Sequence, residues 1–358
     1  AGPMSMRTVF VDKVSSVAQH SDIGNEVRLA DDIPCEEGVL IAARVLNNKS
    51  RYNQLELTSG RMATVKQGDV IVGALGHRKA LRGYSGHLPE SLKPGDSVQI
   101  LNIGGALGIC DSANPEVGAP FDCEVLGTVL HFPYLGERIG VPARAGSNSL
   151  NHDAALSVGS VSVIALAGTC MDSGKTAASC AIISRLRHLG FNVAACKATG
   201  VALRRDILAM EDAGADPTMI FSDFGVVTTT AKNGPALTRS LLQAIAQQRP
   251  DVIVIELGDG LIGEYGVDAI LADAEIQKAL TGVVLCANDP VAAWGGVRLL
   301  GDTYDIKPIV VTGPATDNDV GVDQIRTRLG LPGINALSNA AALGDAVARV
   351  LPKPQAAA

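Results

Sequence analysis

The chain has 358 residues, a formal net charge of −7, and 47% hydrophobic but only 3% aromatic residues. This length allows two domains of ordinary size, and a core built from Ala, Val, Ile and Leu is typical of an α/β enzyme. A general nucleic-acid or membrane-surface binder needs a basic footprint, so we expect neither partner.

The first part of the chain, residues 7–140, is predicted to be a β-rich domain. Two turns of the form Lys-x-Gly-Asp, at 66–69 and 93–96, each open a strand-like run, which is typical of turns that feed strands. The strand-like runs are 8–11, 39–46, 70–75, 98–103 and 124–131. We predict a compact β-barrel or sandwich and regard it as a candidate substrate-binding domain.

A basic loop covers residues 73–87 of this domain. It contains three permanent cations and two histidines, and no acidic residue lies between Asp69 and Glu90. An arginine can offer a bidentate fork to a carboxylate or phosphate, so Arg78 and Arg82 are candidate substrate residues. The alternative is a solvated hairpin loop with an ordinary run of charges.

Residues 141–159 are rich in Gly, Ser and Asn and predict a linker. Beyond it, residues 160–352 are predicted to form a second domain, because strand-like and helical runs alternate to its end. Such alternation favours a parallel sheet covered on both faces, with ligands at the carboxyl ends of the strands. The strand-like runs are 161–167, 191–196, 251–256, 282–287 and 306–312.

The first strand-like run of this domain leads into a predicted phosphate-binding loop. The loop reads Gly168, Thr169, Cys170, Met171, Asp172, Ser173, Gly174, Lys175, Thr176 and Ala177, followed by a helical pattern to Leu189. In such a loop the backbone N–H groups and the helix dipole hold phosphate, the lysine reaches the β- and γ-phosphates, and the hydroxyl binds Mg²⁺. The alternative is a glycine-rich turn that happens to precede a helix. It would leave the succession of strand, Gly-Lys-Thr and helix to chance.

Lys197 follows the next strand-like run. There its compact cation can hold a phosphate or a substrate carboxylate, although a solvated lysine is the alternative. Glu256 ends a later run and is a candidate Mg²⁺ ligand, because this ion prefers carboxylate oxygens together with substrate phosphates. Asp172 and Asp259 are weaker candidates, since both also fit ordinary turns.

Five residues separate Gly168 from Gly174, one more than in the usual pattern. In this form the loop resembles that of dethiobiotin synthetase and the cobyric-acid-synthase group, and the likeness continues through 176–181 and 196–200. The resemblance implies ATP and Mg²⁺ as cofactors, Asp206 and Glu256 as metal ligands together with Thr176, and Lys197 as a catalytic residue beside Lys175. It also implies substrate contacts from Thr199 and Gly200.

This chain departs from that group in two places. Ala198 stands where the group has proline, and the run 310–314 lacks the asparagine that follows the group's last strand. Asn288 and the turn at 331–336 are possible substitutes for recognition of the base. The preference for ATP over GTP therefore comes only from the resemblance.

A second resemblance competes with the first. Residues 197–200, 222–224 and 284–286 are similar to a family related to D-glutamate N-acetyltransferase, whose members usually have methionine at the position of Thr176. A loop without that hydroxyl suits coenzyme phosphates held without Mg²⁺, whereas Thr176 favours a Mg-nucleotide. Neither resemblance extends into residues 7–150.

Our leading hypothesis is a cytoplasmic, homodimeric, ATP- and Mg²⁺-dependent ligase or kinase. It would activate a carboxylate or carbamate of a small acidic metabolite, held by the basic loop across a cleft from the phosphate loop. A coenzyme A-dependent N-acyltransferase acting on an amino acid is the alternative. A nucleotide-driven switch or metallochaperone is a third class, but the sequence has no His and Cys clustered at ligand spacing.

Overall fold

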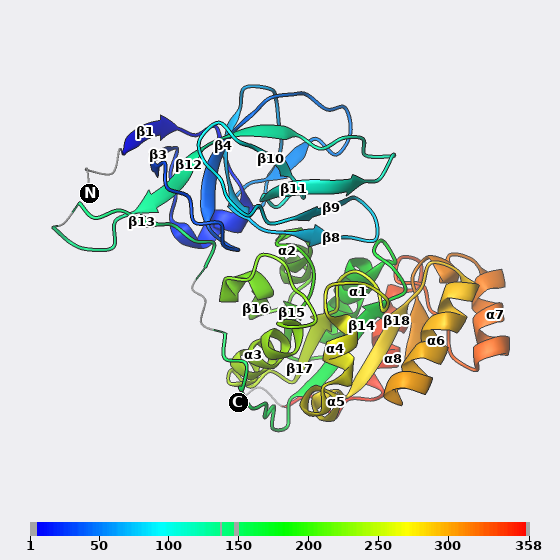
Figure 1. The fold of residues 1–358 in the computed structure, drawn as a ribbon. Coiled ribbons are helices and arrows are strands. Elements are labelled where there is room, and N and C mark those ends of the chain that lie inside the picture. Colours follow the sequence, from blue (N-terminus) through cyan, green and yellow to red (C-terminus); the bar gives the residue numbers. More distant parts are fainter. Residues whose placement is uncertain (1–5, 137, 147–149, 356–358) are drawn as a thin grey trace. The chain divides into compact units, whose positions relative to one another are not determined.

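The computed structural model describes residues 6–136, 138–146 and 150–355. The chain divides into two compact units (Figure 1). The first contains the chain up to residue 149 together with segments 201–205 and 222–228, and the second contains 150–200, 206–221 and 229 onward. Of the predicted linker, residues 147–149 lie outside the described part of the chain.

The first unit is built on a mixed β-sheet. Its strand order is β1-β3-β12-β4-β7-β11-β9-β8, and β10 bonds to both β11 and β12. The strands are β1 (Arg7–Phe10), β2 (Lys13–Val14), β3 (Glu26–Ala30), β4 (Leu40–Val45), β5 (Gln54–Glu56), β6 (Met62–Thr64), β7 (Val70–Leu75), β8 (Arg78–Lys79), β9 (Tyr84–His87), β10 (Ser97–Ile100), β11 (Ala106–Ala113), β12 (Asp122–His131) and β13 (Val141–Pro142). Because β4, β7, β11, β10 and β12 pair in a closed ring, they form a small barrel.

The barrel interior is filled mainly by aliphatic side chains, from predicted strands and also from β11, which the sequence analysis does not predict. Ile41, Ile71 and Leu107 are fully buried in one cluster with Cys123 and Val125. A short 3₁₀ helix, η1 (Ser16–Ser21), follows β2. Residues 141–142, which fall in the predicted linker, pair with β12 as strand β13.

The second unit is a parallel sheet with the order β16-β15-β17-β14-β18-β19. Every pairing in it is parallel. The strands are β14 (Ser162–Gly168), β15 (Val193–Lys197), β16 (Thr218–Ile220), β17 (Val252–Glu256), β18 (Gly282–Cys286) and β19 (Val310–Thr312). The predicted combination of an α/β parallel-sheet domain with a preceding β-rich domain is therefore confirmed.

Helices alternate with these strands. They are α1 (Lys175–His188), α2 (Arg205–Asp212), α3 (Gly234–Ala246), α4 (Val267–Ala272), α5 (Ala274–Ala279), α6 (Pro290–Tyr304), α7 (Asp319–Leu329) and α8 (Ala340–Ala348), with 3₁₀ turns η2 (Phe221–Phe224) and η3 (Pro314–Thr316). Ile182 and Leu186 of α1 pack into one core with Val254 of β17 and Leu343 of α8. This packing fixes α1 beneath the strand that precedes it. Among the described residues, no helix combines the length and apolarity that crossing a membrane requires.

Candidate functional site

The loop between β14 and α1 has the geometry of a phosphate cradle. A Cβ atom on Gly168 would lie 2.3 Å from Ser173 Oγ and 2.7 Å from Lys175 Nζ, so a larger residue would displace these two side chains. Gly174 caps α1 with φ of 87°, and Asp172 takes a left-handed φ of 58°. The loop thus ends at the N-terminus of a 14-residue helix, where backbone N–H groups and the helix dipole attract anions.

Lys175 lies in the interior of this loop and is only 6% exposed. Its ammonium donates to the carbonyl of Cys170 at 2.9 Å, to Ser173 Oγ at 3.3 Å and to the carbonyl of Asp259 at 2.5 Å. These three acceptors are neutral oxygens. A phosphate that binds in the loop would therefore replace neutral acceptors of the Lys175 ammonium with a charged one, which forms a stronger hydrogen bond.

Glu256 closes the site from the end of β17, the strand next to β14. Its carboxylate accepts from Thr176 Oγ1 at 3.3 and 3.4 Å, and its residue is only 2% exposed. The pKa of Glu256 is raised to about 7: burial and the charge of Asp206 raise it, while Lys197, Lys175 and the Thr176 hydrogen bond lower it. A buried carboxylate of this kind is stabilised in its charged form by a nearby cation.

Lys197 and Asp206 form a second polar pair. Their ammonium and carboxylate are 2.6 Å apart, with side chains 9% and 18% exposed. Lys197 stands opposite Glu256 in the pairing of β15 with β17. The structure thus brings together five predicted residues, Lys175, Thr176, Lys197, Asp206 and Glu256.

The donor set fits Mg²⁺ bound together with a nucleotide. The Thr176 hydroxyl and the Glu256 carboxylate lie in contact, and oxygen ligands of this type hold Mg²⁺ alongside phosphates and water. Asp206 would reach the ion only by sharing or leaving its bond to Lys197. Within the part of the chain that the structure describes, no three His, Cys, Asp or Glu residues form a ready-made metal cage.

Two predicted substrate residues, Thr199 and Arg78, are hydrogen-bonded to other residues of the protein. Thr199 is fully buried and donates to the carbonyl of Gly258 at 3.0 Å. Arg78 is 7% exposed, and its Nη1 donates to Tyr52 Oη at 3.0 Å and to the carbonyl of Leu101 at 2.5 Å. Both side chains are buried and hydrogen-bonded within the protein, which the sequence pattern does not reveal.

The remaining two predicted substrate residues, Gly200 and Arg82, belong to different units. Gly200 has a φ of 132° and donates its N–H to Thr229 Oγ1 at 2.9 Å, so it serves a tight turn of the second unit. Arg82 is exposed on the basic loop of the first unit. Its role as a substrate residue stays a prediction.

Supporting contacts of the phosphate loop were missed by sequence reasoning. A Cβ on Gly313, just after β19, would lie 2.4 Å from the carbonyl oxygen of Ser173. Thr169 bonds through its N–H to the Cys286 carbonyl at 2.9 Å, and its Oγ1 accepts from the Asn288 N–H at 3.3 Å. The only available signal was a glycine directly after a predicted strand.

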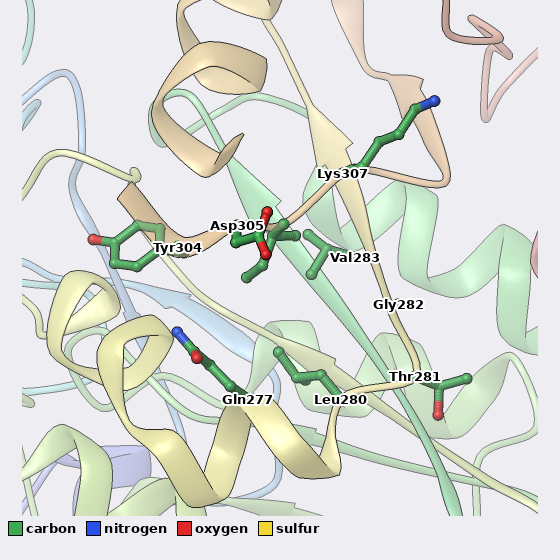
Figure 2. A pocket seen from close by; sticks show the side chains of 9 residues that line it. Gln277, Leu280, Thr281, Gly282, Val283, Tyr304, Asp305 and Lys307 are labelled. Atoms are coloured by element: carbon green, nitrogen blue, oxygen red, sulfur yellow. The ribbon is translucent and has the colours of Figure 1, made fainter. Parts of the chain in front are cut away.

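A separate pocket of about 350 Å³ lies at the other end of β18. It is lined by Gln277, Leu280, Thr281, Gly282, Val283, Tyr304, Asp305, Ile306 and Lys307. Figure 2 shows Gln277 of α5 and Leu280, the residue after that helix, on the side of the pocket that faces Tyr304 and Asp305 at the end of α6. Gly282 is the first residue of β18, whereas the phosphate loop follows the carboxyl end of the parallel strand β14. The pocket therefore lies at the opposite edge of the sheet and is not part of the candidate site.

No protein-family model matches the chain, and no curated protein matches it in sequence. The strand, glycine-bounded loop and helix at the centre of a parallel sheet nevertheless define a P-loop domain by their own geometry.

Among solved structures, the signal recognition particle receptor FtsY from Elizabethkingia anophelis superposes with a TM-score of 0.39 at 16% identity, over 52% of this chain and 64% of that chain. A DUF1611 family protein from Anabaena variabilis gives 0.39 at 14%, over 53% and 58%. Chloroplast FtsY from Physcomitrella patens gives 0.39 at 15%, over 55% and 68%. The chain thus covers less than two thirds of the first two, and likenesses this distant carry no argument about activity.

Proposed function

We propose that this protein binds Mg-ATP at the loop 168–177 and uses it to activate a carboxylate or carbamate of a small acidic metabolite. The observation that supports this is the convergence of two lysines, two carboxylates and a threonine hydroxyl beside the phosphate loop. Phosphoryl transfer is catalysed mainly by positioning and charge neutralisation, so these groups suffice without a protein nucleophile.

Lys175 and the backbone of the loop bind the nucleotide phosphates. The ammonium gives up its bonds to Cys170 and Ser173 and turns to the β- and γ-phosphates. Thr176 and Glu256 would hold Mg²⁺, which when bound would supply charge neutralisation to the phosphates. Neutralisation of Glu256 by a cation also offsets the cost of burying its carboxylate.

Lys197 orients the acceptor. In the chain without ligand it is paired with Asp206, and in the complex its ammonium holds the carboxylate or carbamate of the substrate against the γ-phosphate. One oxygen of that carboxylate attacks the γ-phosphorus, and the bond from that phosphorus to the bridging oxygen breaks. The products are ADP and an acyl phosphate, which an amine then captures with loss of phosphate.

The competing functions have less support in the site. A coenzyme A-dependent N-acyltransferase has no need of the contact between Thr176 and Glu256, which instead suits a metal bound beside phosphates. For a metallochaperone, the described residues provide no group of three metal-ligating side chains. A nucleotide-driven switch would bind its nucleotide at the same loop. It differs from the proposed enzyme only in whether ADP release depends on the small acidic substrate.

Titration calorimetry with Mg-ATP, Mg-GTP and acetyl-CoA tests the proposal directly. We expect binding of Mg-ATP that is lost with EDTA, and ADP release that rises only when a small acidic metabolite with an acceptor carboxylate is added. Binding of acetyl-CoA with no effect of Mg²⁺ would favour the acyltransferase. Rapid ADP release without any partner would favour the switch.

A further inference from the structure

The pocket at the amino end of β18 lies wholly within the second unit and away from the phosphate loop. Its volume of about 350 Å³ falls in the range of small-molecule sites. Its lining comes from α5 and the residues that follow it, from the start of β18, and from the end of α6 and the residues that follow it. The proposed function uses none of these residues, so a ligand of this pocket would be a second one.

Part of the lining is apolar. Leu280, Val283 and Ile306 all contribute to it. Val283 is only 1% exposed, and the other two side chains are half-buried. Burial of hydrocarbon against such a surface is favourable, so the pocket suits a ligand with an apolar body.

Three polar side chains of the lining can accept hydrogen bonds. Gln277 Nε2 donates to the carbonyl of Leu271, which leaves Oε1 as the end of this amide that can accept. The Tyr304 hydroxyl and the Asp305 carboxylate are the other two acceptors, and Figure 2 shows both on the side of the pocket that faces Gln277. An ammonium group has three donors and no acceptor, so these side chains complement it.

The charges around the pocket also favour a cation. Asp305 is the C-cap of the 15-residue helix α6, where the helix dipole adds negative potential. Burial raises the pKa of Tyr304, and the charge of Asp268 raises it as well, so a second carboxylate acts on this side of the pocket. Lys307 lines the pocket too, but in Figure 2 its ammonium points away from Asp305. Lys278 of α5 is exposed and is not a lining residue.

An organic cation fits this lining better than a metal ion does. Asp305 is the one carboxylate among the lining residues, and the described part of the chain has no group of three His, Cys, Asp or Glu residues placed to hold a metal. A divalent ion needs several oxygen ligands. It would also leave the apolar part of the lining in contact with water.

We propose that this pocket binds a small organic ammonium ion. The charged nitrogen is held by Asp305, with Gln277 and Tyr304 as further acceptors, and the carbon skeleton packs on Leu280 and Val283. The proposal is independent of nucleotide binding at the phosphate loop.

The test uses three probes of similar shape and different charge: cyclohexylamine, cyclohexanol and cyclohexanecarboxylate. At neutral pH they are a cation, a neutral molecule and an anion. In nuclear magnetic resonance spectra of the isotope-labelled full chain, we expect the amine to shift the Gln277 side-chain amide and the backbone N–H signals of Gly282 and Val283. The proposal is overturned if millimolar amine shifts none of these signals, or if either of the other probes binds as tightly as the amine.

D305N removes the charge and keeps the shape of the side chain. Asp305 has a left-handed φ of 54°, which asparagine also adopts readily, so we expect the variant to fold. Because the carboxylate is exposed to solvent, the dissociation constant of cyclohexylamine should rise only roughly three- to tenfold. An unchanged constant would overturn the assignment of the charge to Asp305.

D302N is the matched control on the same helix. Asp302 forms an ion pair with Arg298 at 3.3 Å and does not line the pocket. Its substitution removes the same charge from the end of α6, so the dissociation constant should stay within about twofold of wild type. Equal weakening in D302N and D305N would show a general attraction for cations and overturn the proposal. Calorimetry with Mg-ATP tests the proposed function separately, since neither substitution touches the phosphate loop.

Discussion

At the scale of single residues, Lys175 carries the largest expected effect on nucleotide binding. Its ammonium is buried and bonded to three neutral oxygens, two in the loop and the carbonyl of Asp259, so a phosphate would be a stronger partner. We expect K175A to lower the affinity for Mg-ATP about 100-fold, since a charged hydrogen bond of about 3 kcal/mol is lost.

Calorimetry measures this affinity, and circular dichroism checks that the variant is folded. K278A is the matched control, because Lys278 is exposed on α5 of the same unit. Binding by K175A at wild-type strength would rule out the loop as the phosphate site.

Glu256 predicts a pH dependence of stability. Burial raises its pKa from 4.5 to about 7 in the fold, so between these pH values the folded chain binds more protons than the unfolded chain. The free energy of unfolding of the ligand-free protein should therefore fall as the pH rises through this window, and the full penalty is present above it.

E256Q removes the ionisable group. We expect it to unfold at a higher urea concentration than wild type at pH 8, with a much smaller difference at pH 5. Parallel curves for the two proteins at both pH values would contradict the burial of a charged carboxylate at this position.

At the scale of elements, the sequence predicts the long buried strands but not the short or half-exposed ones. The runs that became β14, β17 and β18 are mainly apolar, and their predicted ends lie within one residue of the observed ends. β16 has three residues, and β11 ends in the half-exposed stretch from Cys110, so neither shows a strong pattern. Lys197 and Glu256 could be singled out from the sequence because each stands at the end of a strand.

Gly313 shows an element-scale constraint that no periodicity reveals. Its φ is 91°, and a side chain there would meet the carbonyls of Ser173 and Ala287 at 2.4 and 2.9 Å. G313A should therefore displace the end of the phosphate loop and lower Mg-ATP affinity about tenfold or more, an effect of at least about 1.4 kcal/mol.

G295A is the matched glycine control, measured by the same calorimetry. Gly295 lies within α6, and nothing stands within 4 Å of an added Cβ. Alanine there should raise the unfolding free energy by roughly 0.5–1 kcal/mol and leave binding unchanged. Equal affinities of G313A and wild type would show that the loop tolerates the shift.

At the scale of the whole molecule, the sequence indicates two domains but not how the chain is shared between them. Segments 201–205 and 222–228 belong to the barrel unit although they lie within the predicted P-loop domain. Their attachment depends on Glu37, Glu56 and Asn102, residues at least 100 positions away. Contacts over such separations leave no periodic trace in a single sequence.

The two arginines of the basic loop separate the stability of the barrel unit from substrate binding. Arg78 is buried and bonded to Tyr52 and Leu101, so R78A leaves acceptors without a donor and should destabilise the barrel unit by about 1.5–3 kcal/mol. Arg82 is exposed, so R82A should change stability by no more than about 0.5 kcal/mol.

If the loop holds the anionic group of the substrate, R82A should instead raise the substrate KM roughly 10- to 150-fold, which is the loss of one charge-assisted bond. The affinity for Mg-ATP should stay the same, because the phosphate loop belongs to the other unit. Thermal unfolding of both variants, with steady-state kinetics of R82A, measures these effects. An unaltered KM in R82A would leave the basic loop as a solvated hairpin, and a parallel loss of ATP affinity would assign Arg82 to the nucleotide instead.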